Sequence, residues 1–312
     1  PRQAGKTTLS KLKLKRDHCE KLYYLWDLRS VRNRYKENEL FFSADIPPSK
    51  EKKFWVCFDE IHKIPKWKNI LKGIYDETED FYQFIITGSA KLNIARRAGD
   101  SLSGRYFIFN LFPLTLREAS GNPVISHQDF QDSLNFILSR LDKKACPDET
   151  LSSLLEYSAF PEPFVRQSKV FHNKWSRDYL DRVITEDIRA FTPIIDQERL
   201  YDLYRLLPEM VGSPISKNSL AGHLETNPVT INNHLNKLED FYLLFRVTPY
   251  AKNIKRAILK ASKWYLYDWT LIKDKAARFE NFVAMELSTM ISFWRDLSGD
   301  DYSLFYIRSK EG

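Results

Sequence analysis

The first eight residues carry side chains that could bind a polyphosphate. They read Pro-Arg-Gln-Ala-Gly-Lys-Thr-Thr, which matches the end of the pattern G-x-x-x-x-G-K-[ST]. A glycine lets the backbone approach phosphates closely, and successive N–H groups at a helix start form an anion nest. In this pattern Lys6 contacts the β- and γ-phosphates and the Thr7 hydroxyl binds Mg²⁺. The predicted nucleotide-binding residues are Ala4, Gly5, Lys6, Thr7 and Thr8; the alternative is a turn that matches by chance.

Two carboxylates follow the first strongly apolar segment. Residues 53–58 read Lys-Phe-Trp-Val-Cys-Phe, and Asp59 and Glu60 come directly after them. A short apolar run of this kind is typical of a buried parallel strand, whose carboxyl end is where open α/β sheets bind ligands. In nucleotide hydrolysis the first acid holds Mg²⁺ and the second polarises a water. We therefore predict ATP and Mg²⁺ as ligands; the alternative is a strand that ends in a solvated acidic turn.

Polar residues also follow the next apolar segment. Residues 81–86 are predicted to form a strand, and the small polar residues Thr87 and Ser89 lie just after it. Either hydroxyl could sense a γ-phosphate, or could simply stabilise a turn. Arg105 precedes the apolar residues 106–109, a further predicted strand. An arginine there could stabilise the transferred phosphoryl group as an arginine finger, or could pair with a surface acid.

Composition limits the class of protein. The 312 residues are 43% hydrophobic and 29% charged, which is typical of a globular protein of two or three domains. The formal net charge of +7 permits an anionic partner. No apolar run approaches the length that spans a bilayer, so no membrane contact is predicted. Cys19, Cys57 and Cys146 are far apart, which indicates a reducing compartment and a cytoplasmic location.

Strands and helices are expected to alternate in the first 120 residues. The predicted strands are 22–27, 53–58, 81–86 and 106–109, and the predicted helices are 7–16, 29–42 and 67–75. Alternation of this kind favours a parallel sheet with helices on both faces. The fold class predicted for residues 1–120 is therefore an α/β P-loop NTPase domain.

Several motifs together resemble one family. They are Ala4-Gly5-Lys6-Thr7-Thr8, Phe58-Asp59-Glu60-Ile61-His62-Lys63-Ile64-Pro65, Ile86-Thr87-Gly88-Ser89, Gly104-Arg105 and Leu111-Phe112-Pro113-Leu114-Thr115. The chain resembles prokaryotic AAA-type ATPases that carry a C-terminal domain of unknown function. The resemblance implies Walker A residues Lys6 and Thr7, a Walker B pair Asp59 and Glu60, a sensor at Thr87 or Ser89, and a finger at Arg105. The first Walker A glycine is expected upstream of Pro1.

The resemblance implies an ATP hydrolase. Because no substrate-pocket motif accompanies the nucleotide site, whereas a separate helix-turn-helix module follows it, we expect a nucleotide-gated switch. An arginine finger at Arg105 would complete the site of an adjoining subunit, which makes a homo-oligomer a further expectation. Another class of protein remains open, a regulator that binds ATP without hydrolysing it.

Residues 121–211 are predicted to form a helical lid or linker. A long helix is expected at 172–191, with Thr185, Glu186 and Asp187 interrupting its apolar stripe. These carboxylates could join the nucleotide site of a neighbour, but a solvated helix face is the favoured interpretation.

Residues 212–270 are predicted to form a winged helix-turn-helix. The expected helices are 215–224 and 228–241, and the expected wing strands are 242–247 and 263–267. In the second helix Ile231, Leu235 and Leu238 should face a core, while the outward residues are Thr230, Asn232, Asn233, Asn236 and Lys237. Residues 246–263 include six Lys or Arg and no Asp or Glu. DNA is therefore a predicted partner, with phosphate contacts from Lys252, Lys255 and Arg256; a protein-contact surface is the alternative.

Residues 271–312 are predicted to begin an α/β C-terminal domain. The region holds an amphipathic helix at 279–294 and a strand at 304–308. The family resemblance implies a restriction-endonuclease-like fold here, with Glu280 matching a helix glutamate. The acidic pair that would complete such a site does not occur up to Gly312, and Glu280 is explained as favourable to the helix dipole.

Overall fold

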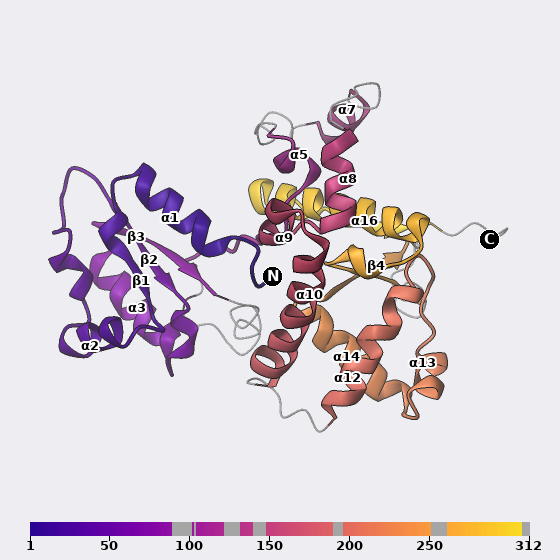
Figure 1. Ribbon diagram of the computed structural model, residues 1–312. Helices are drawn as coiled ribbons and strands as arrows, with labels where there is room; N and C mark the ends of the chain where they lie inside the picture. Colours follow the sequence, from indigo (N-terminus) through magenta and orange to yellow (C-terminus); the bar gives the residue numbers. More distant parts are fainter. Residues whose placement is uncertain are drawn as a thin grey trace. The chain divides into compact units, whose positions relative to one another are not determined.

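The computed structural model describes residues 1–88, 102, 104–121, 132–139, 148–189, 196–250 and 261–307 (Figure 1). The chain divides into two compact units. One unit is Gly5–Phe107, and the other combines Pro1–Ala4 with Ile108–Gly312.

A parallel sheet forms the centre of the Gly5–Phe107 unit. Its strands are β1 (Tyr23–Leu25), β2 (Phe54–Asp59) and β3 (Tyr82–Thr87), in the order β1-β2-β3. Asp59 lies opposite Leu25 on one side and Thr87 on the other. The three strands therefore end at the same edge, which brings the residues at their carboxyl ends together.

Helices cover this sheet on both sides. They are α1 (Lys6–Arg16), α2 (Arg29–Glu37) and α3 (Trp67–Thr78), with short 3₁₀ turns η1 (Glu20–Leu22), η2 (Phe41–Ala44) and η3 (Ile61–Lys63). The connections that contain α2 and α3 each join two neighbouring parallel strands, and such crossovers are right-handed. They therefore place α2 and α3 on one face, and Figure 1 shows α1 on the other. The predicted parallel α/β organisation is confirmed for these strands.

Aromatic rings fill the core of this unit. Phe58 of β2 is fully buried, with ring centroids 5.6 Å from Trp26 and 5.9 Å from Phe42. These pairs meet edge to face, the arrangement that aromatic quadrupoles favour. Because β2 is the middle strand, its residues from Val56 to Phe58 are buried on both faces. The core fixes the end of β2, where Asp59 stands.

The predicted strand at 106–109 is wrong. Residues 106–110 are irregular, and the Phe107 and Phe109 side chains are 89% and 66% exposed. Apolar side chains favour a strand only where a neighbouring strand completes its hydrogen bonds, and among the described residues none pairs with this segment. The predicted helix at 29–42 also ends early, because the backbone is extended at Asn38.

The second unit begins with short helices. They are α5 (Leu116–Ala119), α7 (Ser133–Leu138), α8 (Asp148–Tyr157) and α9 (Pro161–Arg166). The helix α10 (Lys169–Arg182) follows and passes directly into a π-helical turn, η4 (Val183–Ile188). The predicted helix at 172–191 therefore starts earlier and changes its hydrogen-bonding pattern before it ends. The helix α12 (Gln197–Leu206) and the 3₁₀ turn η5 (Leu207–Glu209) come next.

Two capped helices and a strand pair occupy the 212–270 region. The helices are α13 (Lys217–His223) and α14 (Pro228–Asp240), and the strands are β4 (Leu244–Pro249) and β5 (Lys263–Leu266), which pair antiparallel. The Asn227 side chain accepts a hydrogen bond from the Thr230 amide, which ends the turn and starts α14. The predicted core residues Ile231, Leu235 and Leu238 are all fully buried.

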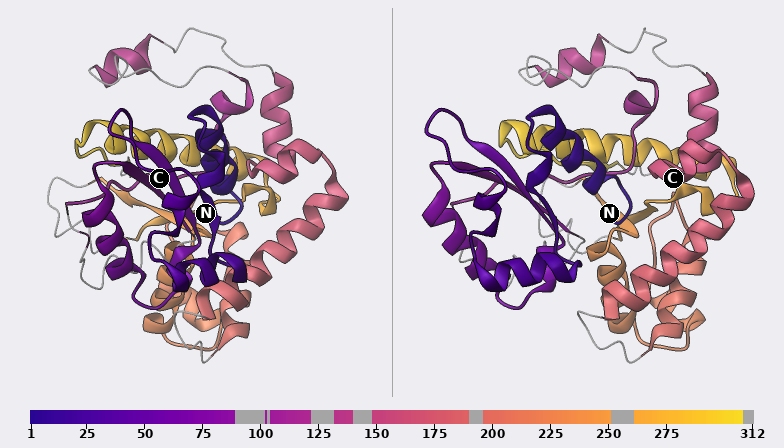
Figure 2. Two further views of the ribbon diagram at one scale, coloured as in Figure 1. Left: turned by 90° about the vertical axis from the view of Figure 1, so that its left-hand side faces the viewer. Right: turned by 60° about the vertical axis from the view of Figure 1, so that its left-hand side comes forward.

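The last described elements are a 3₁₀ turn, a long helix and a short strand. They are η6 (Trp269–Leu271), α16 (Lys275–Ser298) and β6 (Phe305–Tyr306). The 24-residue α16 (yellow in Figure 2) begins at a cap from Asp274 and ends at Gly299, whose φ of 76° suits glycine. β6 pairs parallel with β4, so the sheet has the order β5-β4-β6. No helix among the described residues is long and apolar enough to cross a bilayer.

Candidate functional site

Asp59 is the centre of a hydrogen-bonded cluster at the carboxyl ends of β2 and β3 in the Gly5–Phe107 unit. Its Oδ2 atom accepts from the Thr7 hydroxyl at 2.8 Å and from the Tyr23 hydroxyl at 2.6 Å. Its Oδ1 atom accepts from the Thr87 hydroxyl. The helix α1 and three strands each contribute one member. The structure therefore brings together Thr7, Asp59 and Thr87, which the sequence singled out, and adds Tyr23, which it did not.

The cluster keeps the Asp59 carboxyl ionised. The residue is only 3% exposed, and burial alone would raise its pKa. The hydrogen bonds from Thr87, Tyr23 and Thr7, with the positive charge of Lys6, outweigh burial and lower the pKa. The same contact and burial raise the pKa of the Tyr23 hydroxyl, so it remains a donor.

The predicted phosphate-binding residues lie at the start of α1. Gly5 has φ 97° and ψ 9°, a left-handed conformation that costs little only for glycine, and Lys6 begins the helix. No acidic residue occupies the first turn of α1, so its amides meet no competing carboxylate within that turn. Thr7 and Thr8 are exposed. Ala4 is buried and groups with the other unit.

Glu60 follows β2 in a conformation that non-glycine residues seldom adopt. Its φ is 63°, and its amide donates to the Thr87 carbonyl at 3.0 Å. Burial is the largest effect on its carboxyl and raises the pKa, the charge of Asp59 acts in the same direction, and Lys63 opposes them. A carboxylate with a raised pKa at a strained backbone position is typical of a functional site.

Sequence reasoning missed the cation beside Glu60. Lys63 Nζ lies 2.6 Å from Asp27 Oδ2 and 3.5 Å from Glu60 Oε2. His62 Nε2 also lies 3.5 Å from the same Glu60 oxygen, and the His62 side chain is only 3% exposed. Lys63 lies in the motif that runs from Phe58 to Pro65, but the motif gave it no role, because its contact with Asp27 joins the ends of two strands.

The remaining predicted site residues do not join this cluster. The Arg105 Nε atom donates to Asp76 Oδ1 of α3 at 2.7 Å, and both side chains are partly exposed. This is the surface ion pair named as the alternative above. Ser89 lies outside the described residues.

The donor set at Asp59 fits a magnesium ion that also binds phosphates. Mg²⁺ in nucleotide sites takes one or two protein oxygens and fills its shell with water and phosphate oxygens. Thr7 and Asp59 offer a hydroxyl and an ionised carboxylate that already touch. Within the described ranges no group of three or more His, Cys, Asp and Glu side chains forms a self-sufficient metal site.

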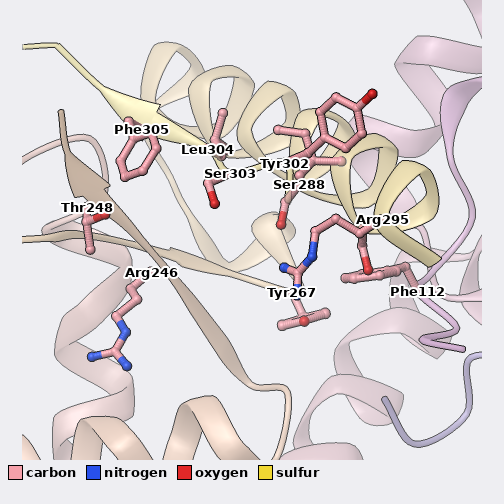
Figure 3. A pocket seen from close by; sticks show the side chains of 12 residues that line it. Phe112, Arg246, Thr248, Tyr267, Ser288, Arg295, Tyr302, Ser303, Leu304 and Phe305 are labelled. Carbon is pink, nitrogen blue, oxygen red and sulfur yellow. The ribbon is translucent and has the colours of Figure 1, made fainter. Parts of the chain in front are cut away.

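A hollow of about 310 Å³ occurs in the other unit. The residues that line it include Phe112, Tyr267, Ser288, Arg295, Tyr302 and Phe305, and no carboxylate is among the lining residues. Figure 3 shows the Arg295 guanidinium between Ser288 and Tyr267, whereas the guanidinium of Arg246, which also lines the hollow, points away from these two residues. Arg246 pairs with Glu239 at 3.2 Å. The lining offers no acid–base pair, so we assign it no reaction.

Family models match two separate stretches of the chain. Residues 1–120 match a model described as an AAA domain. Residues 148–280 match a model described as a domain of unknown function (DUF8612). Residues 1–120 are therefore similar to AAA domains and residues 148–280 to a domain of unknown function, which supports the AAA-like resemblance in the sequence.

The curated relatives are themselves uncharacterized proteins. One from Haemophilus influenzae is 22% identical over 77% of this chain and 59% of its own length. One from Methanocaldococcus jannaschii is 29% identical over 66% of this chain and 45% of its own length. One from Mycobacterium tuberculosis is 22% identical over 98% of this chain and 66% of its own length. The chain thus spans about half to two thirds of the relatives it matches.

Proposed function

We propose that this chain binds ATP with Mg²⁺ and hydrolyses it, as the nucleotide-gated switch of an AAA-type protein. The observation that carries the proposal is the 2.8 Å hydrogen bond between Thr7 and Asp59. It joins the two predicted magnesium-binding side chains, and Glu60 follows directly in sequence.

Different residues of the site bind the phosphates, hold Mg²⁺, accept the proton and sense the γ-phosphate. The amides around Ala4, Gly5, Lys6, Thr7 and Thr8 bind the phosphates, and the Lys6 ammonium neutralises part of their charge. Mg²⁺ held by Thr7 and Asp59 would stabilise negative charge on the phosphate oxygens. Glu60 accepts a proton from the attacking water, and its raised pKa suits that role. Thr87, with Ser89 as the second candidate, senses the γ-phosphate.

Replacing Glu60 tests the hydrolytic role. In the full-length protein, Glu60→Gln should keep Mg·ATP affinity within about 2-fold. It should slow turnover at least about 100-fold, as expected for loss of a general base. The matched control is Glu77→Gln, an exposed carboxylate of α3 in the same unit. Turnover retained in Glu60→Gln would contradict the assignment.

A regulator that binds ATP without hydrolysis is the alternative, and the contact between Glu60 and Lys63 favours it. A carboxylate engaged by a cation is a weaker base. Phosphate release by the wild-type protein, measured with and without DNA, separates the two functions. No release under either condition would favour the passive regulator.

We also propose that residues 212–270 form a winged helix that binds DNA. The element order α13, α14, β4 and β5 supports this proposal. Asn233 supports it too, because its side chain is exposed on α14 while the opposite face of that helix is buried. The wing residues Lys252, Lys255 and Arg256 lie outside the described residues. A helix-turn-helix can equally serve as a protein contact, and the salt dependence of DNA binding distinguishes these uses.

A further inference from the structure

The first residues of the phosphate-binding loop are held by side chains more than 170 positions away. Arg2 Nη2 lies 2.7 Å from Glu186 Oε2, and Arg2 Nη1 lies 3.1 Å from Asp187 Oδ2. Trp175 Nε1 donates to Gln3 Oε1 at 2.7 Å. All five residues belong to one compact unit, because Pro1–Ala4 group with Ile108–Gly312.

These contacts correct the expectation of a solvated helix face at 185–187. Asp187 is only 7% exposed, so its carboxylate requires a charged or hydrogen-bonding partner. Glu186 is the more exposed of the two, and its contact alone would contribute little. Two carboxylates on one planar guanidinium form a directional contact that a lysine would not reproduce.

The backbone on both sides of this contact is unusual. Gln3 has a φ of 58°, which non-glycine residues seldom adopt. Glu186 and Asp187 lie in the π-helical turn η4, which interrupts the regular hydrogen bonding of α10. Such turns are rare and frequently mark functional positions. The contact therefore joins two segments of irregular backbone, the loop at Gln3 and the π-helical turn η4, through the side chains of Arg2, Glu186 and Asp187.

We propose that Glu186, Asp187 and Trp175 are positioning residues for the phosphate-binding loop, and that through Arg2 and Gln3 they couple nucleotide binding to the π-helical turn. The proposal rests on the nucleotide site described above. Arg2 and Gln3 precede Gly5 and Lys6 in one continuous loop, so a ligand that orders the loop backbone acts on a segment already held by η4. The contact therefore makes the α10–η4 segment responsive to nucleotide.

Thermodynamic linkage requires the coupling to act in both directions. If η4 stabilises the loop conformation that binds phosphate, bound nucleotide must stabilise η4 by the same factor. Loss of the contact should then weaken nucleotide binding, and nucleotide should slow amide hydrogen exchange in Val183–Ile188. A merely structural contact would give neither effect, because its loss would act on stability alone.

The first experiment measures Mg·ATP affinity by calorimetry. Wild type is compared with Arg2→Gln and Asp187→Asn, which remove either partner, and with Asp202→Asn, which removes an exposed carboxylate of α12. We expect the first two variants to bind about 5- to 100-fold more weakly, the range of allosteric couplings, and the control to bind as wild type. The charge exchange Arg2→Asp with Asp187→Arg should recover part of the affinity that each single change loses.

The second experiment measures the reverse direction. Amide exchange in Val183–Ile188 should slow when Mg·ATP is added to wild type, and the change should be absent in Arg2→Gln. Tryptophan emission offers a parallel readout, because Trp175→Phe should remove any nucleotide-dependent change that arises at the contact with Gln3.

The outcomes separate this inference from the proposed function. Wild type that binds no nucleotide would overturn both. Wild type that binds nucleotide, with Arg2→Gln and Asp187→Asn folded and binding equally well, would overturn the coupling and leave the nucleotide site standing. Equal exchange in η4 with and without nucleotide would also overturn it.

Discussion

Asp59 and Thr87 lie opposite each other at the ends of β2 and β3, and the Thr87 hydroxyl donates to the Asp59 carboxylate. The backbone repeats the pairing one residue later, where the Glu60 amide donates to the Thr87 carbonyl. The proposed magnesium ligand and the proposed sensor are therefore linked in the protein itself. A displacement of Thr87 would alter the hydrogen bonds of Asp59 and the backbone of Glu60 together.

Removing the Tyr23 hydroxyl should make the site more sensitive to acid. The hydroxyl bonds to Asp59 help to lower its pKa, so Tyr23→Phe should raise that pKa. Because ionised Asp59 is needed to hold Mg²⁺, the acid limb of the ATPase pH profile should move to higher pH. Activity near pH 7 should fall only a few-fold, which is the effect of one hydrogen bond.

The matched control for this change is Tyr35→Phe. The Tyr35 hydroxyl contacts Glu39 at 3.4 Å, away from Asp59. An acid limb that stays in place in Tyr23→Phe would mean that Tyr23 only packs against β2.

We expect Arg105 to act in hydrolysis at the site of a neighbouring subunit. Arg105→Ala should reduce turnover at least about 100-fold, as for other arginine fingers, and mixing it with Glu60→Gln should restore part of the activity. Each mixed interface can then pair an intact finger with an intact base. Turnover by the mixture is compared with turnover by each variant alone.

Asp76→Ala is the control for Arg105, because it breaks the same ion pair and keeps the guanidinium. If the mixture stays inactive, Arg105 either acts within its own chain or is structural. If Asp76→Ala is as inactive as Arg105→Ala, the ion pair itself is what activity requires.

Glu286 should make the second unit less stable at higher pH. Its carboxyl accepts from the Leu116 amide at 2.9 Å, and burial raises its pKa from 4.5 to about 7. The protonated form therefore favours the fold: its contribution is complete below about pH 4.5, falls as pH rises to about 7, and is constant above. Glu286→Gln should be more stable than wild type above pH 7 by roughly 1–3 kcal/mol.

Chemical denaturation at several pH values measures this difference. Glu209→Gln, an exposed change in the same unit, should leave the pH dependence of wild type unaltered. A Glu286→Gln profile parallel to that of wild type would show that the pKa of Glu286 is the same in the folded and unfolded protein.

The DNA proposal makes different predictions for the wing and for α14. Replacing Lys252, Lys255 and Arg256 with Ala should weaken binding to all sequences and reduce the salt slope by about one unit for each lost phosphate contact. Asn233→Ala should weaken binding to a preferred sequence without changing the slope. Fluorescence anisotropy at several salt concentrations measures both. Unchanged affinity and slope in the wing variant would identify a protein-contact surface.

Local patterns were sufficient to predict much of this protein. The sequence alone was enough to single out Gly5 and Lys6 at the start of α1, Asp59 and Glu60 at the end of β2, and Thr87 at the end of β3. Strand ends and phosphate-binding loops depend on short-range chemistry, so local patterns indicate them. The buried face of α14 was readable for the same reason, since Ile231, Leu235 and Leu238 repeat at helical spacing. The strand predicted at 106–109 was wrong, because the composition of a segment does not show whether a partner strand lies beside it.

The sequence by itself determined the nucleotide-binding chemistry and the α/β character of residues 1–120, since each depends on neighbouring residues. Only the tertiary structure decided which distant side chains meet. Tyr23 begins β1 opposite Cys57, and its hydroxyl reaches Asp59 because β1 and β2 pair in parallel; Lys63 reaches Asp27 because both follow the carboxyl ends of these two strands. Arg2 meets Glu186 and Asp187 although more than 180 positions separate them in the sequence. Contacts of this kind depend on packing over the whole chain, which no local pattern encodes.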